Sequence, residues 1–275
     1  MPNKAWICLP VAALLLWGCG EKSEPRTDWT PEKVQAALKE KNPDYNGNAQ
    51  VQIELGRVIA AQLSGTGITD LSPLRRMQLQ GLDIRGLQVA DLSPLAGQPL
   101  VEFYAEDTSV TDISPLNGMK LMRLYLSNTR VTDLSPLAGS ALAELNLLGC
   151  PVTDLTPLSG LPLQMLWLNG APVSDISPLK NCPLVSLTLE GTQVKDLTPL
   201  AGVRTLERLH IGHTPVTDLT PIRSLRLTRL IFTPGRIKKG LEIARQMPSL
   251  RELGTTFENR MPPEQFWSLY EQGKL

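Results

Sequence analysis

Aspartate recurs along this chain at a spacing that could serve either metal binding or turn formation. Eight aspartates follow one another at steps of 21 residues, with a last step of 22: Asp70, Asp91, Asp112, Asp133, Asp154, Asp175, Asp196 and Asp218. Each one opens the same motif, Asp-Leu/Ile-Ser/Thr-Pro-Leu/Ile. A calcium ladder needs several oxygen ligands per site, whereas each turn here offers one carboxylate. We therefore expect each carboxylate to accept the backbone N–H two residues on, with the Ser or Thr capping a helical turn that begins at Pro.

The remaining residues that could do chemistry do not form a recognisable active site. The chain has two histidines, His210 and His213, with no Asp, Glu or Cys at a spacing that would complete a metal site. No Gly-x-Ser-x-Gly, His-Glu-x-x-His or P-loop motif occurs. Glu102 and Glu144 are a carboxylate pair of the kind found on any acidic repeat surface. We therefore predict no catalytic residue, no metal and no cofactor.

A second pattern precedes each aspartate and shows which elements must position these side chains. The unit reads L-x-x-L-x-L-x-x-T-x-V-T-D-L-S-P-L-A-G, as in Leu121, Leu124, Leu126, Thr129 and Val131. The L-x-L step has the period of two that is typical of a short strand with one buried face. A strict period of 21 residues indicates a solenoid, in which each unit buries its apolar side only against its neighbours.

The expected fold class is an α/β solenoid with one parallel β-sheet and short helical or 3-10 turns on the convex side. Helical caps should close both ends, because an open stack would expose its leucines. Ten strands are predicted to begin near residues 58, 79, 100, 121, 142, 163, 184, 206, 227 and 250.

The repeat unit resembles the leucine-rich repeat, most closely the short internalin-type unit of bacterial proteins, over roughly residues 58–233. The resemblance implies a curved, right-handed coil that binds a partner and catalyses nothing. The family usually places Asn three residues after the last leucine of the strand. Here that position holds Thr108, Thr129, Cys150, Ala171, Thr192 and Thr214. Threonine bonds local backbone less completely than Asn, and Cys150 and Ala171 are expected to interrupt the ladder.

The segments flanking the repeats, residues 29–57 and 234–275, read as caps. Thr30-Pro31-Glu32 starts a helix, and helices are also expected over residues 237–247 and from Pro262. The aromatic side chains of the last helix, Phe266, Trp267 and Tyr270, are expected to close the core rather than to bind a partner. The flanking segments also look similar to those of some planctomycete-type repeat proteins, some of which carry a kinase. No kinase motif occurs in this chain.

The first 28 residues predict export and lipid attachment. Lys4 precedes an apolar run from Ala5 to Trp17 that is too short to span a bilayer but suits a signal peptide. The sequence from Leu16 to Cys19 resembles a bacterial lipobox, which implies that Cys19 is acylated. An ordinary signal peptide that contains a cysteine is the alternative. The predicted divisions are a signal peptide over 1–18 and a tether over 19–28, in a lipid-anchored envelope protein of the outer rather than the inner membrane if the cell is Gram-negative.

Cysteine usage and charge exclude several function classes. Cys150 and Cys182 lie two repeats apart, about 9.6 Å for equivalent positions, which is too far for a disulfide. The chain has 27 basic and 27 acidic residues, so no basic excess indicates nucleic acid as a partner. The lipid is the only expected contact with the membrane.

The concave face of the sheet is the predicted binding site. The central outward position of the strands holds Tyr104, Tyr125, Trp167 and His210. The column beside it holds Glu102, Arg123 and Arg208. Aromatic residues and Arg most often anchor protein interfaces. These residues predict that the concave face binds another protein, whose identity the sequence does not give. Packing of Tyr104 on Tyr125 is the structural alternative, and a glycan stacked on the rings is the alternative ligand.

Overall fold

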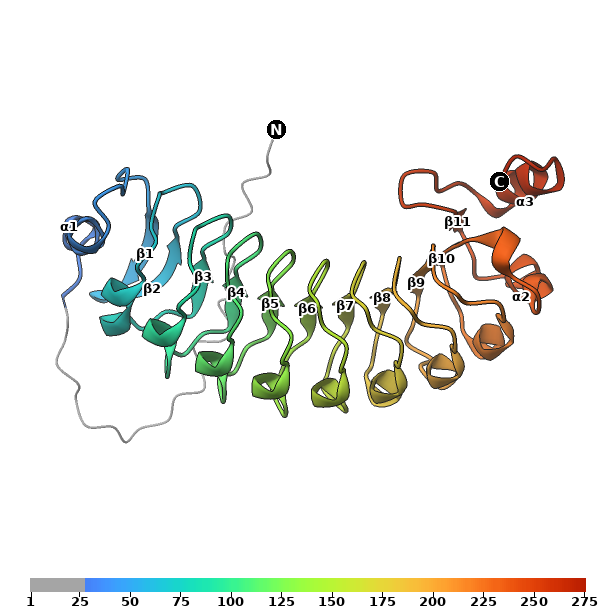
Figure 1. The fold of residues 1–275 in the computed structure, drawn as a ribbon, viewed down its shortest axis with the longest axis horizontal. Coiled ribbons are helices and arrows are strands. Elements are labelled where there is room, and N and C mark those ends of the chain that lie inside the picture. Colours follow the sequence, from blue (N-terminus) through green and yellow to red (C-terminus); the bar gives the residue numbers. More distant parts are fainter. Residues whose placement is uncertain (1–27) are drawn as a thin grey trace.

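The computed structural model describes residues 28–275 as one curved stack of coils with a cap at each end (Figure 1). Within these residues, eleven strands form a single sheet in chain order. The strands are β1 (Gln50–Glu54), β2 (Arg57–Gln62), β3 (Gly81–Asp83), β4 (Glu102–Tyr104), β5 (Arg123–Tyr125), β6 (Glu144–Asn146), β7 (Met165–Trp167), β8 (Ser186–Thr188), β9 (Arg208–Ile211), β10 (Arg229–Phe232) and β11 (Glu252–Gly254). The predicted Cys19 and signal peptide lie outside the described residues.

The ten strands from β2 to β11 pair in parallel, which confirms the predicted sheet. Their register also confirms the predicted columns, because Tyr104 pairs with Tyr125 and Thr188 pairs with His210. The regular hydrogen-bonded pairing of the strands starts two residues later than predicted. In β5, for example, the N–H groups of Met122 and Arg123 both donate to the carbonyl of Val101, and the regular pairs begin only after this shared acceptor.

The edge strand β1 was not predicted. It pairs antiparallel with β2 through a tight turn at Leu55 and Gly56, both of which have a positive φ. Leucine rarely adopts this conformation, so the sequence carries no strong hairpin signal at the turn. The result is a hairpin that extends the sheet beyond the first repeat.

The recurring aspartates form the turns at the start of the convex side. In all eight, Oδ1 accepts the backbone N–H two residues on at 2.7 or 2.8 Å, which confirms the predicted role. A 3-10 turn follows each one, for example Ser93–Leu95. The prediction that Ser or Thr caps this turn is wrong. Ser93 is the first residue of the turn and donates its hydroxyl to Oδ2 of Asp91 at 3.0 Å, because the aspartate already holds the Ser93 N–H. The proline therefore comes second in the turn.

Leucine, isoleucine and valine side chains of successive repeats fill one continuous core. A threonine beside the core, as in Thr129, donates its hydroxyl to the carbonyl three residues back at 2.7 Å. Cys150 breaks this pattern only in part, because its thiol reaches the Leu126 carbonyl of the preceding repeat at 3.0 Å. Cys150 and Cys182 are free and buried, as expected of small apolar residues.

Helical caps close both ends of the core. Helix α1 (Pro31–Lys41) starts at the predicted Thr30, whose Oγ1 accepts the Lys33 N–H. Helix α2 (Leu241–Gln246) begins later than predicted because Gly240 is left-handed, and a Cβ there would lie 2.8 Å from the Thr220 nitrogen. In helix α3 (Pro263–Glu271), Phe266 and Trp267 pack against Phe232, so these aromatics act as the predicted cap. No helix among residues 28–275 is long and apolar enough to cross a membrane.

Candidate protein-binding surface

The predicted aromatic residues lie together on the concave face. Tyr104 and Tyr125 meet edge to face, with ring centroids 5.2 Å apart. Trp167 is two strands beyond Tyr125, yet their ring centroids are only 5.8 Å apart. Both rings therefore lean over the strand between them. All three side chains are half-buried, so the structure combines the two interpretations of the sequence: the rings pack on one another and still present a surface.

A network of ion pairs and hydrogen bonds holds the two tyrosine side chains in place. Arg123 forms ion pairs with Glu102 on one side and with Glu144 on the other, the latter at 3.2 Å. The Tyr104 hydroxyl donates to Glu102 at 3.1 Å, and the Tyr125 hydroxyl donates to Glu144 at 2.7 Å. Burial, followed by the charge of Glu102, raises the pKa of Tyr104 to about 12. Glu102 is itself only 2 % exposed, so it supports the aromatic surface from beneath.

The turns after strands β3 and β4 add residues that the predicted site did not include. Arg85 is exposed and forms an ion pair with the buried carboxylate of Asp83, with Nη2 of Arg85 2.6 Å from Oδ2 of Asp83. The Arg85 guanidinium also lies 5.7 Å from the centroid of the Tyr104 ring. Glu106 is one position along the same outward column as Arg85 and is half-buried. The signal was in the sequence, since the column two residues after the aromatics also points outward.

The other predicted residues lie at the far end of the face, where the surface is covered. His210 is only 4 % exposed, and Ile231 next to it is 1 % exposed. The chain after β11 turns back here, and we call residues 255–261 the return segment. The carbonyl of Thr255 and the His210 ring both lie against Gly212, and the guanidinium groups of Arg229 and Arg260 both lie over the Phe257 ring. The prediction of an open His210 is wrong because the return segment occupies its place, whereas Arg208 stays partly exposed.

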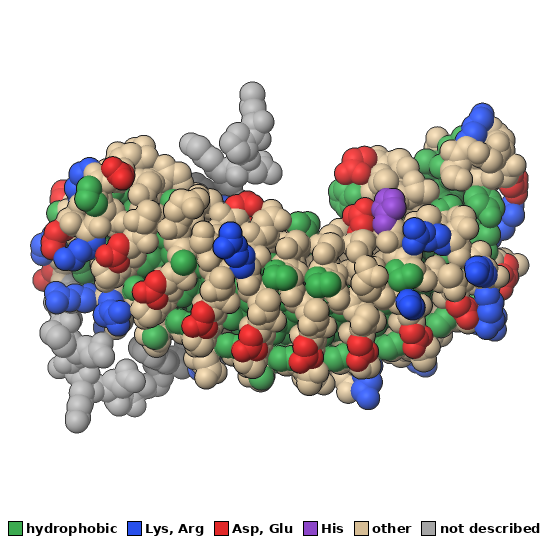
Figure 2. All heavy atoms as spheres, in the orientation of Figure 1, with side chains coloured by type: hydrophobic (Ala, Val, Ile, Leu, Met, Phe, Trp, Pro, Cys, Tyr) green, Lys and Arg blue, Asp and Glu red, His purple; other side chains and the backbone are tan. Residues whose placement is uncertain are grey.

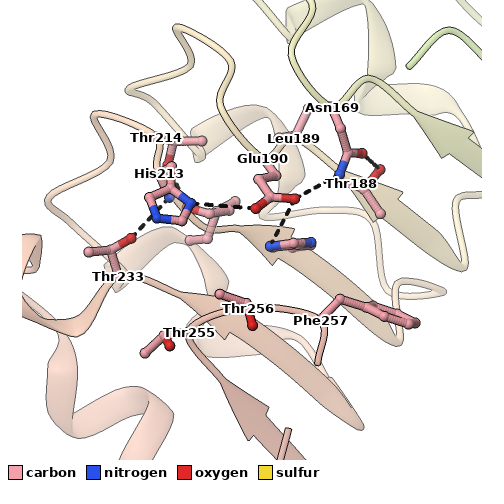
Figure 3. A network of polar contacts seen from close by, with 12 residues as sticks. Asn169, Thr188, Leu189, Glu190, His213, Thr214, Thr233, Thr255, Thr256 and Phe257 are labelled. Carbon is pink, nitrogen blue, oxygen red and sulfur yellow. Dashed lines mark hydrogen bonds and ion pairs between the residues drawn. The ribbon is translucent and has the colours of Figure 1, made fainter. Parts of the chain in front are cut away.

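A polar network borders the covered part of the face (Figure 3). The Glu190 carboxylate lies 3.4 Å from Nδ1 of His213 and 3.8 Å from Nε2 of His210, and it accepts a bond from Asn169 at 3.1 Å. Burial lowers the pKa of His210, which keeps it neutral near pH 7. In the part of the chain that the structure describes, no group of three or more His, Cys, Asp or Glu residues is arranged to hold a metal ion.

The convex flank is uniform by comparison. Acidic side chains form a regular row along this side of the coil (Figure 2), at the positions of the turn-forming aspartates. In each of them Oδ1 accepts the N–H of the turn, as described above. The chemical variety that could select a partner therefore lies on the concave face.

Comparison with known proteins supports the repeat assignment. An internalin (InlF) of Listeria monocytogenes superposes with a TM-score of 0.65 at 26% identity, over 82% of this chain and 68% of that one. The fold is a leucine-rich-repeat solenoid. Internalin C2 of the same organism has the same fold, with a TM-score of 0.63 at 24% identity, over 73% of this chain and 92% of that one. No protein-family model and no curated protein sequence matches the chain. Leucine-rich-repeat solenoids usually serve as binding modules rather than enzymes, with an extended concave surface.

Proposed function

We propose that this leucine-rich-repeat protein is a non-catalytic module that binds another protein through the open part of its concave face. The observation that carries the proposal is the cluster of Tyr104, Tyr125 and Trp167. Three large rings with fixed orientation offer contact area at little cost in conformational entropy, which is typical of interface hot spots. Arg123 supplies a partly exposed guanidinium next to them.

The polar residues of this surface favour binding over catalysis. A general acid or base needs a carboxylate that is free to exchange a proton with a substrate. Glu102 and Glu144 are instead tied to Arg123 and to a tyrosine hydroxyl each. This closed network positions the side chains and leaves neither Glu102 nor Glu144 free to accept a proton from a substrate.

Site-specific crosslinking tests the proposal in cells. A photoreactive amino acid at Trp167 should capture the partner, whereas one at Lys195, on the convex side, should capture none. Once the partner is purified, the double substitution of Trp167→Ala with Tyr125→Ala should weaken binding by at least about 2 kcal/mol, the hot-spot threshold. The matched control is Ser159→Ala with Lys195→Ala on the convex turns. Loss of binding in the control alone would place the partner on the convex face.

A glycan is the alternative ligand, since tyrosine and tryptophan faces also stack on sugars. If the ligand is a glycan, the wild-type protein should bind to a glycan array, the aromatic double variant should lose that binding, and no protein should be crosslinked at position 167. That result would support the same binding surface with a glycan in place of a protein as the ligand.

We also propose that the protein is anchored to a bacterial envelope by a lipid on Cys19, and to the outer rather than the inner membrane if the cell is Gram-negative. The lipobox-like sequence before Cys19 supports this. Cys19→Ser should release the exported protein from membrane fractions, as measured by fractionation and by mass spectrometry of the mature N-terminus. An unacylated N-terminus elsewhere on the wild-type protein would contradict the anchor. The similarity of the flanking segments to planctomycete-type proteins stays a prediction.

A further inference from the structure

The open part of the concave face carries an excess of negative charge. We call the outward side chains of β3 to β6 and of the turns that follow β3 and β4 the acidic half. It contains five carboxylates, those of Asp83, Glu102, Glu106, Asp107 and Glu144. Two guanidinium groups, those of Arg85 and Arg123, oppose them. If every group is charged, the acidic half has a formal charge of −3, although the whole chain is neutral.

Both guanidinium groups are already engaged within the protein. Arg85 binds Asp83 through two parallel contacts, Nε to Oδ1 at 3.0 Å and Nη2 to Oδ2 at 2.6 Å. Such a bidentate pair is strong and fixes the orientation of the guanidinium. Arg123 bridges Glu102 and Glu144. Neither cation is left to neutralise the carboxylates that lie outside these pairs.

Within residues 28–275, two carboxylates of the acidic half are left without a cation: Asp107, which accepts a hydrogen bond from Asn128 at 2.8 Å, and Glu106. Oε2 of Glu106 is buried and has no hydrogen-bond partner in the described part of the chain. Burial, with smaller contributions from the charges of Asp83 and Asp107, raises the pKa of Glu106 to about 7, against the opposing effects of its own backbone and of Arg85. A desolvated carboxylate without a partner costs free energy, so the protein holds Glu106 in an unfavourable state. The side chain as a whole is only half-buried, so a group from outside can reach it although Oε2 itself is enclosed.

The neighbouring rings suit the same kind of group. The face of an aromatic ring attracts a cation, and Tyr104 already has the Arg85 guanidinium 5.7 Å from its centroid. Tyr125 and Trp167 continue this surface toward the C-terminal end. A cationic side chain with an aliphatic stem could pack its stem on the rings and place its charge at Glu106.

We propose, on the basis of the proposed function, that the acidic half recognises a protein segment that presents a lysine or arginine side chain, with Glu106 as its ion-pair acceptor and the Tyr104–Tyr125 surface as its packing platform. A cationic segment neutralises the excess charge, which neutral sugars and acidic segments do not. Charge complementarity of this kind contributes to selectivity and association rate.

A second glutamate in the same outward column provides a matched control. Glu190 lies after β8 and already contacts Asn169, His210 and His213. It has the same side chain and the same place in the repeat, but its carboxylate is already partnered. Glu190→Gln should therefore leave binding of a cationic segment unchanged.

The experiment uses the full-length protein in detergent and a phage library of random dodecapeptides. The selected peptides are synthesised with Arg replaced by citrulline or Lys by acetyl-lysine, which removes the charge and keeps the shape. We expect lysine or arginine in the selected peptides and at least a tenfold loss of affinity for the neutral versions. Glu106→Gln should weaken the charged peptides about tenfold and bring them level with their neutral versions.

The dependence on pH gives a second readout. Glu106 is mostly protonated at pH 6 and ionised at pH 8, and the charged groups that face it are Asp83, Asp107 and Arg85. Affinity for the charged peptides should therefore rise about tenfold from pH 6 to pH 8, the factor that one pH unit on each side of a pKa near 7 allows. The rise should be absent in Glu106→Gln and present in Glu190→Gln.

The outcomes separate this inference from the proposed function. Peptides that depend on Tyr125 and Trp167 but show no preference for a cation, or no effect of Glu106→Gln, would overturn the inference and keep the concave binding surface. Peptides that bind independently of the aromatic pair would overturn both. Failure to select any peptide above background would also count against a linear cationic segment.

Discussion

The two ends of the concave face are built from the same repeat and the same strand register, yet they differ in what they present. The acidic half is open, with half-buried aromatic rings over a network of Arg123 and two glutamates. Around β9 and β10, which we call the covered half, equivalent positions hold His210 and Ile231, and both are buried. The return segment takes the place there that a partner could take in the acidic half.

This difference shows that the repeat determines where side chains point but not whether they are exposed. Tyr125 and Ile231 occupy the same column, yet Tyr125 is half-buried while Ile231 is buried, at the end of the face where the return segment lies. Glu106 and Glu190 also share a column, but only Glu190 has partners for its carboxylate. Substitutions at equivalent positions in the two halves therefore test the comparison directly.

The largest expected effect is the one that should be equal in both halves. Leu124 and Leu209 are inward-facing residues of β5 and β9, and both are fully buried. Leu124→Ala and Leu209→Ala should each destabilise the protein by about 3–5 kcal/mol, because each opens a cavity between coils. Chemical denaturation measures both. A much smaller cost for either one would show that the core is not continuous between the halves.

The outward residues should differ between the halves. Ile231→Ala should cost about 2–3 kcal/mol, because Ile231 is only 1 % exposed and its truncation leaves a cavity. Tyr125→Ala, in the same column, should cost less, about 0.5–1.5 kcal/mol, since it removes ring contacts at a partly open surface. The same denaturation experiment compares them, and equal costs would contradict the distinction between open and covered halves.

Glu106 and Glu190, which share an outward column, should differ in their response to substitution. The raised pKa of Glu106 means that ionisation costs the folded state more than the unfolded one. The penalty is absent below the ordinary value of 4.5 and complete above about 7, so Glu106→Gln should stabilise the protein at pH 8 by about 1–2 kcal/mol after allowance for solvent screening, and should have no effect at pH 4. Glu190→Gln should give no gain at pH 8. Stabilisation by both variants, or by neither, would remove the contrast.

The smallest expected effect concerns the turns, which are alike along the chain. Asp91→Ala and Asp196→Ala should each cost about 0.5–1 kcal/mol, as losses of capping groups do. Hydrogen bonds from the residue two positions on lower the pKa of both carboxyl groups. Their contribution is therefore present above the unfolded value of 3.8 and is lost as the pH falls below it. Stability measured from pH 6 to pH 2 should show this loss in the wild type and less of it in the variants.

The repeat fold could be predicted from the sequence because the same local sequence pattern recurs every 21 residues. The aspartate turns, the ten parallel strands and the columns of the concave face all follow from side-chain alternation and spacing. Single departures were harder to predict. The hairpin at Leu55 and the left-handed Gly240 at the start of α2 each occur once, so no repeated signal identifies them.

The candidate site was predicted in part. The positions of Tyr104, Tyr125 and Arg123 followed from register, and their mutual contacts agree with it. The contact between Tyr125 and Trp167 did not, because a count of strands places them apart while the long side chains lean together. Glu106 lies in the outward column two residues after the aromatic residues, but its lack of an ion-pair partner arises because Arg85 binds Asp83 instead.

By itself the sequence determined the coil, its register and the set of side chains on each face, since these depend on contacts between neighbouring repeats. Tertiary structure alone decided which of those side chains reach solvent and which charges are paired. Exposure depends on the return segment, which comes from the C-terminal end of the chain and lies against β9 and β10. Charge pairing depends on Arg85, which binds Asp83 rather than Glu106. Neither contact belongs to the period of the repeat, so the periodic signal contains no information about them.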